Sequence, residues 1–337
     1  MKFSPTSANL LLFMVLAGTL PGAQQVPIDT SSVSPEIEEA AKWVSLAPKV
    51  GVRYDYEVTA AVRMLLFWIS RDDVGQGYIQ TGAMPGNPAM ETIELVMGSD
   101  PAKAPMGINR WGAASEVWRQ DNHSGVFFGF MKASQNDSVG SAREEISKEK
   151  DTQKYQYNGI ISQMNSGRAF SAVVPISSAT DFTLHQLPLA QQMVLQELKS
   201  HARPPRVLDA RSLEGCSTGI GFLFTVRELI DGVLDANRSP NTRCYVYHAR
   251  RYMMTLKDCE PVKEMKVALK LHGASRKVER IYRDLKRADF TVLNTQSKER
   301  TDFEVVFGSA GELRGVPVQI EYQPSWWFRV TLNLMKQ

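Results

Sequence analysis

The sequence predicts a β-rich α+β fold, in which one or more long, curled antiparallel sheets carry a few amphipathic helices packed on one face. Three observations lead to this prediction. Apolar and polar residues alternate over many segments, Gly/Pro-rich connectors separate the early segments, and only a few segments show helical spacing. The chain has 337 residues, 43% of them hydrophobic and 22% charged. This composition is that of a globular protein of one or two domains, and it excludes disorder, collagen and coiled coil.

The N-terminus predicts a secretory signal peptide over residues 1–23. Lys2 supplies a positive charge, an apolar run covers residues 10–20, and small residues stand at Gly22 and Ala23. The run is about half as long as a membrane-spanning helix, and no later run reaches that length. We therefore expect an exported chain, periplasmic or extracellular, with no transmembrane segment after cleavage. No cysteine lies near the cleavage site to carry a lipid anchor.

The N-terminal half is predicted to be a series of strands. Residues 24–47 are a Pro/Ser-rich segment, and from Tyr54 to Trp68 apolar side chains then stand at every second position. This predicts one strand of unusual length, which must bend or belong to a strongly curled sheet. The next strands are predicted at residues 91–97, 114–119, 126–132, 155–162 and 169–175.

Two amphipathic helices are predicted in the middle of the chain, at residues 189–200 and 220–236, because their apolar side chains are spaced as on one helical face. The prolines at 204 and 205 end the first helix. They mark a boundary between two domains or half-sheets, residues 48–203 and 206–337.

The C-terminal part returns to strands and is predicted to close in a β-meander. A hairpin is expected to turn between Ala249 and Arg250, and residues 275–288 are ambiguous but favour a short helix. The strands are predicted at residues 244–248, 251–256, 265–271, 303–307, 316–322 and 326–334.

Three features of residues 211–335 occur together. They are a helix, the stretch Arg243-Cys244-Tyr245-Val246-Tyr247-His248-Ala249-Arg250-Arg251-Tyr252, and the late stretch Gly311-Glu312-Leu313-Arg314-Gly315-Val316-Pro317-Val318-Gln319-Ile320-Glu321-Tyr322. This part resembles a family of exported bacterial β-sheet proteins classed only as a domain of unknown function, which is similar in style to curled-sheet carriers of the LolA kind. The resemblance covers a little over a third of the chain and implies no catalytic residues.

Composition and motifs exclude several classes of function. A formal net charge of +3 is too small for a nucleic-acid-binding face. The GxSxG, HExxH, P-loop and GxGxxG motifs are absent, and we predict no cofactor and no catalytic residue. No metal site is predicted because the five histidines are scattered singly: His123, His185, His201, His248 and His272.

Two groups of residues are candidates for a site. A polar site at a strand end is suggested by Arg71, Asp72 and Asp73, although a turn in which the carboxylates accept backbone N–H bonds is the favoured interpretation of the stretch. A ligand-binding role is suggested for large side chains that core packing would also explain: Tyr56, Met64, Trp68, Arg110, Trp111 and Trp326.

The three cysteines, Cys216, Cys244 and Cys259, are disulfide candidates. The expected hairpin register places Cys244 opposite Thr255, so a bridge to Cys259 is not expected. This leaves Cys216 paired with one of the other two, or no bridge.

The functional hypothesis is an exported envelope protein that binds a hydrophobic ligand or a protein partner without catalysis. A lipid-like molecule would lie between the sheet and the helices, with methionines as an adaptable lining. The alternative is an exported hydrolase whose site is assembled from distant residues, so enzymatic activity stays open.

Overall fold

A computed structural model of the chain describes residues 50–64, 67–84, 87–104, 110–119, 124–133, 155–165, 168–178, 192, 193, 196, 197, 206–208, 213, 216, 221–235, 241–247, 250–270, 277–325 and 328–336. The predicted signal peptide and the Pro/Ser-rich segment lie outside them. The proposed domain boundaries stay a prediction.

The N-terminal half consists of strands that each pair antiparallel with the next one along the chain. They are β1 (Val50–Met64), β2 (Phe67–Met84), β3 (Asn87–Ser99), β4 (Trp111–Arg119), β5 (Ser124–Ala133), β6 (Tyr155–Asn165), β7 (Arg168–Ser178) and β8 (Arg206–Leu208).

The C-terminal half begins with the helix and continues in strands. Its elements are α5 (Phe222–Leu234), β9 (Thr242–Tyr247), β10 (Arg250–Leu269), β11 (Val278–Asn294), β12 (Arg300–Gly308), the 3-10 turn η3 (Gly311–Leu313), β13 (Pro317–Ser325) and β14 (Phe328–Lys336).

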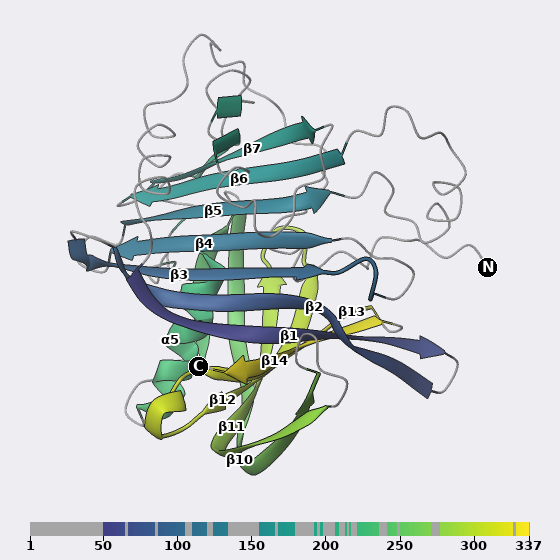
Figure 1. Cartoon of the computed structure of the whole chain (residues 1–337). Coiled ribbons are helices and arrows are strands. Elements are labelled where there is room, and N and C mark those ends of the chain that lie inside the picture. Colours follow the sequence, from purple (N-terminus) through teal and green to yellow (C-terminus); the bar gives the residue numbers. More distant parts are fainter. Residues whose placement is uncertain are drawn as a thin grey trace, which may run out of the picture.

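All fourteen strands belong to one antiparallel sheet. Their order is β8-β7-β6-β5-β4-β3-β2-β1-β14-β13-β12-β11-β10-β9, so pairing of the first strand with the last joins the two halves. The sheet curls, and β10 to β12 run behind and across the strands of the N-terminal half (Figure 1). The predicted curled, β-rich sheet is therefore confirmed.

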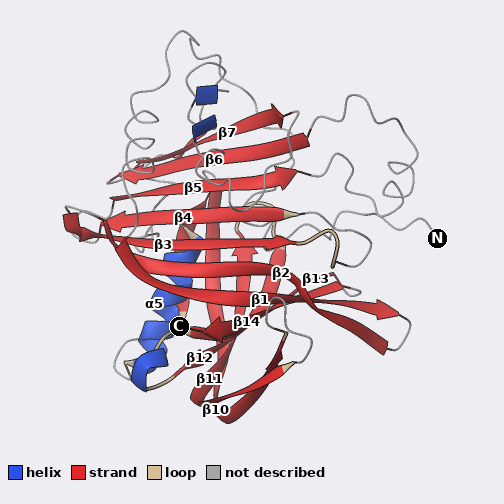
Figure 2. Cartoon of the chain, in the orientation of Figure 1, coloured by secondary structure: helices blue, strands red, loops and turns tan. Residues whose placement is uncertain are grey.

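The helix α5 lies on the inner face of this curl, between the two halves (Figure 2). It contacts β3 and β4 on one side and β9 and β10 on the other. Its apolar face supplies Leu223, Phe224, Leu229 and Ile230 to the core. In the described part of the chain α5 is the only α-helix whose bounds are defined. The prediction of a few helices on one face of the sheet therefore overstated their number. Of the predicted helix at 189–200, only short helical pieces are described.

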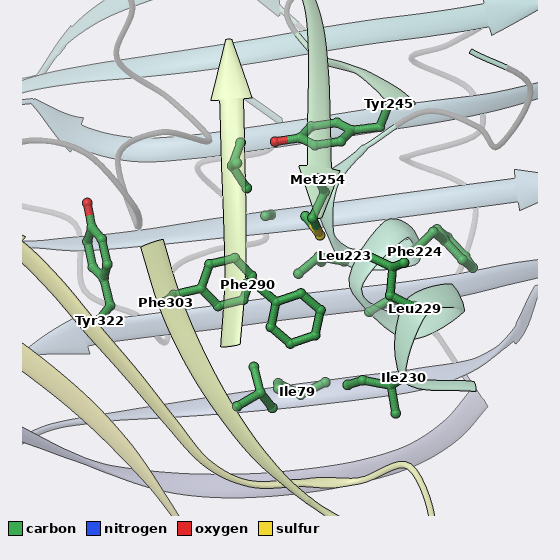
Figure 3. Packing of buried hydrophobic residues seen from close by; sticks show 14 of the residues in the cluster. Ile79, Leu223, Phe224, Leu229, Ile230, Tyr245, Met254, Phe290, Phe303 and Tyr322 are labelled. Atoms are coloured by element: carbon green, nitrogen blue, oxygen red, sulfur yellow. The ribbon is translucent and has the colours of Figure 1, made fainter. Parts of the chain in front are cut away.

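The main core fills the space between the halves and α5. Phe290 and Phe303 stack at 4.9 Å between ring centroids, and both lie close to α5 (Figure 3). A second cluster covers the opposite face of the N-terminal half, because alternate residues of its strands point to opposite sides. Its aromatic members are Trp111, Phe128, Phe130, Tyr157 and Phe170.

Three predictions about the strands are wrong. The strand expected from Tyr54 to Trp68 is two strands, because the chain reverses between Met64 and Phe67 to form the β1–β2 hairpin. Of the segment 275–288, for which a short helix was favoured, residues 278–288 belong to β11. The segment 265–271 is not a separate strand, since β10 runs without interruption from Arg250 to Leu269.

Candidate functional site

An apolar surface runs along the inner face of β1 toward the end of the β1–β2 hairpin. Val62 pairs directly with Ile69 of β2 and with Phe328 of β14, and directly paired residues project to the same side of a sheet. Met64 pairs with Phe67 in the same way. We call Val62, Phe67, Ile69, Phe328 and Val330 the distal apolar surface.

This surface begins in the core and ends in solvent. Tyr56 and Val58, earlier on the same face of β1, are 0% and 5% exposed, whereas Ile69 is 57% and Phe67 72% exposed. Phe328 and Val330 are partly buried and pack against the main core. The apolar inner face therefore extends beyond the part that the protein's own side chains cover.

The opposite face of the same hairpin carries aromatic and basic side chains. The guanidinium carbon of Arg329 lies 4.5 Å from the ring centroid of Trp68, within the range of a cation–π contact. Arg63 is the direct partner of Trp68 across the hairpin. The predicted ligand residue Trp68 is thus half-buried beneath an arginine at the end of the hairpin.

The stretch Arg71-Asp72-Asp73 lies within β2, at a bulge, and not at a strand end as expected. Val58 pairs with Gly75 whereas Ala60 pairs with Arg71, so β2 holds extra residues there. Asp73 has a φ of 55°, in the left-handed region that aspartate tolerates better than most residues.

A buried carboxylate holds this bulge against the C-terminal half. Glu57 accepts a hydrogen bond from the backbone N–H of Asp73 and another from that of Lys270, both at 2.8 Å. Burial raises the pKa of Glu57, partly offset by the two backbone donors. Asp72 forms an ion pair with Lys277, and Asp73 forms one with Lys103 at 2.9 Å. The cluster acts as a joint in which every carboxylate has a partner.

A second buried carboxylate anchors the helix. Glu116 of β4 is 0% exposed and accepts hydrogen bonds from the backbone N–H groups of Leu223 and Phe224, at 2.9 and 3.0 Å. These groups begin α5 and lack partners within the helix. Burial raises the pKa of Glu116 to about 7 despite the donors. Such a group could move protons, but its contacts are those of a helix anchor.

Cys216 and Cys244 form a disulfide, with Cα atoms 4.7 Å apart. It ties β9 to the segment that precedes α5. Cys259 is a free, half-buried thiol whose pKa is raised by burial. The expected hairpin register was wrong by two residues, because Cys244 lies opposite Met253 and not Thr255.

The other predicted ligand residues do not form one site. Tyr56 is fully buried in the main core and donates a hydrogen bond from its hydroxyl to the carbonyl of Pro317 at 2.7 Å. Trp111 lies in the second cluster, on the other side of the sheet, and is 3% exposed. Arg110 donates its backbone N–H to Ser99. The side chain of Met64, all of Trp326 and the five histidines lie outside the described residues.

Sequence reasoning missed the two most exposed members of the distal apolar surface, Phe67 and Ile69. One signal could have found them: an apolar run, Met64-Leu65-Leu66-Phe67-Trp68-Ile69, lies between Arg63 and Arg71. It also missed Glu57 and Glu116, whose partners are distant in sequence.

Within the described ranges, no group of three or more His, Cys, Asp or Glu side chains is arranged to hold a metal ion. None of the helices there is long and apolar enough to cross a membrane.

No protein-family model matches the chain, and no curated protein matches its sequence. Among solved structures, the chain is similar to a beta-barrel-like protein of the domain of unknown function DUF1849 from Brucella abortus. The likeness covers 84% of this chain and 95% of that one, with a TM-score of 0.41 and 12% identical residues. We take no function from it.

Proposed function

We propose that this chain is an exported, non-enzymatic protein that binds a hydrophobic ligand on the distal apolar surface. The observation that supports the proposal is the exposure of Phe67 and Ile69 at the end of an otherwise buried apolar face. Contiguous exposed apolar residues on a folded protein commonly mark a binding site. A lipid-like chain laid along this face would contact Val62, Phe328 and Val330 as well.

The place of the ligand differs from the one that the sequence suggested. We expected it between the sheet and the helices, but α5 fills that space with its own buried side chains, Leu223, Phe224, Leu229 and Ile230. The uncovered part of the inner face lies beyond the helix, at the end of the β1–β2 hairpin. The sequence suggested either a hydrophobic ligand or a protein partner. This arrangement suits a small hydrophobic ligand better, because the distal apolar surface continues directly into the core.

Titration of the purified protein with a fluorescent fatty-acid probe tests the proposal. The double substitution Phe67→Ser and Ile69→Ser should weaken probe binding about tenfold or more, since each buried apolar side chain contributes roughly 1.5–3 kcal/mol. Val52→Ser is a matched control, because Val52 is an exposed apolar residue of β1 (54%) near the other end of the hairpin. Equal probe affinity in all three proteins, or no probe binding at all, would contradict the proposal.

A further inference from the structure

The end of the β1–β2 hairpin is apolar in sequence and flanked by arginines. Six consecutive residues, Met64 to Ile69, are apolar, with Arg63 before them and Ser70 and Arg71 after them. The strand β1 ends at Met64 and β2 begins at Phe67, so the hairpin reverses within this run. In Figure 1 that end extends to the right, beyond the neighbouring strands β3 and β14.

Two apolar side chains of this end, Phe67 and Ile69, are largely uncovered by the rest of the protein. Phe67 and Ile69 are 72% and 57% exposed on one face, and Trp68 is on the other. Folding alone gives no reason to place three large apolar residues in a row where two of them face water. Tryptophan in particular is enriched where a protein meets the interface between water and lipid.

Basic groups surround the apolar run and remain available for an anionic partner. Within the described part of the chain, the side chains of Arg63 and Arg71 form no hydrogen bond or ion pair; Arg71 is exposed, whereas Arg63 is half-buried and its Nε atom is buried. A third guanidinium, that of Arg329, lies over the ring of Trp68, but it is already ion-paired with Glu321 at 3.3 Å. Long arginine side chains can reach headgroups while neighbouring apolar residues enter the acyl region. Anionic headgroups attract such clusters within a Debye length.

We propose that the end of the β1–β2 hairpin docks on the surface of an anionic lipid bilayer. Phe67, Trp68 and Ile69 enter the interfacial region, and Arg63 and Arg71 bind the negatively charged headgroups. A protein partner would not need two arginines, Arg63 and Arg71, placed on either side of the apolar run. This inference concerns a surface contact and goes beyond ligand binding. Docking there would bring the distal apolar surface against the lipid from which a hydrophobic ligand could be taken.

Flotation with vesicles tests the inference. The protein should float with vesicles of phosphatidylcholine containing 30% phosphatidylglycerol, but not with phosphatidylcholine alone, and 0.5 M salt should weaken binding. Arg63→Gln with Arg71→Gln should weaken binding about thirtyfold, the factor expected when two basic residues leave an anionic surface. Phe67→Ser with Ile69→Ser should abolish it, and Val52→Ser should leave it unchanged.

Two further variants separate this inference from the proposed ligand site. The arginine double variant should keep its affinity for the soluble fatty-acid probe in the absence of vesicles. Phe328→Ala, on β14 and separated from Ile69 by β1, should weaken probe binding while flotation is retained. Comparing the melting temperatures of all variants shows whether each remains folded.

Three results would overturn the inference. The first is equal binding to neutral and anionic vesicles. The second is flotation that is indifferent to the arginine substitutions. The third is the absence of flotation; if the wild-type protein then proved dimeric and the Phe67→Ser, Ile69→Ser variant monomeric, the surface would be an interface between copies of this chain.

Discussion

The carboxylate of Glu116 occupies the place that a side chain on Gly221 would need. Gly221 precedes α5 with a φ of 101°, and a Cβ added there would lie 2.2 Å from Cδ of Glu116. Its own N–H donates to the carbonyl of Val246 in β9. The start of α5 is therefore clamped between β4 of one half and β9 of the other, and glycine is required there for two separate reasons.

Replacing Gly221 by alanine should destabilise the protein by roughly 2–4 kcal/mol, from backbone strain and from the clash with Glu116. The measurement is urea unfolding followed by circular dichroism. Gly311→Ala is the matched control, because Gly311 also has a positive φ, 64°, but a Cβ there would meet nothing within 4 Å. It should cost only about 1 kcal/mol. Equal losses in the two variants would show that Glu116 does not crowd this position.

The stability of the protein should depend on pH through Glu116. Its pKa in the folded state is raised to about 7 from an ordinary value of 4.5. The folded protein therefore holds this proton more tightly than the unfolded chain does. The resulting stability is fully present below about pH 4.5 and is lost as the pH rises through about 7.

Glu116→Gln removes this titration and provides the measurement. The free energy of unfolding of the wild-type protein, minus that of the variant, should fall by up to roughly 3 kcal/mol between pH 4.5 and pH 8. Denaturant unfolding at four or five pH values is sufficient. A difference that stays constant with pH would mean that the carboxyl group titrates as an exposed glutamate does.

The disulfide should stabilise the fold by about 3–4 kcal/mol, as expected for a closed loop with a sequence separation of 28 residues. Cys216→Ser should lower the free energy of unfolding by about that amount, and Cys259→Ser should change it by less than about 1 kcal/mol. Thiol titration of the denatured, non-reduced wild-type protein should give one free thiol. A count of three would contradict the bridge.

The sequence predicted the strands well where one face is buried, because alternation with period two reports burial directly. It failed at the β1–β2 turn, since residues 64–67 contain no Gly, Pro, Asn or Asp, and Met64, Leu66 and Trp68 continue the alternation through the reversal. Two strands were therefore interpreted as one, and the exposed end of the hairpin was predicted to be a buried strand.

Long-range pairing explains the other failures. Val278, Ile281, Tyr282 and Leu285 fit helical spacing, but their segment pairs along its length with β10, and this pairing decides its conformation. Glu116 stands 107 residues before its hydrogen-bond donor Leu223. No local pattern marks a carboxylate whose partners are backbone groups of a distant helix, so the anchor of α5 could not be predicted from the sequence.

The joint at Glu57 should depend on both of its carboxylate oxygens. One oxygen accepts from Asp73 in the β2 bulge, and the other accepts from Lys270 at the end of β10. In Glu57→Gln one oxygen becomes an NH2 group, which cannot accept and would face a backbone donor. A buried donor left without an acceptor costs about 1–3 kcal/mol, so we expect a loss of stability of that size.

Hydrogen exchange locates the effect of this change. The amides of Asp73 and Lys270 should exchange faster in Glu57→Gln, because the bulge and the end of β10 are no longer held together. Glu304→Gln is the control: Glu304 is half-buried and paired with Arg287 at 3.2 Å, so its loss should cost less than about 1 kcal/mol and leave both amides protected. If those two amides exchanged at the wild-type rate in Glu57→Gln, the joint would have to be held by the Asp72–Lys277 and Asp73–Lys103 ion pairs instead.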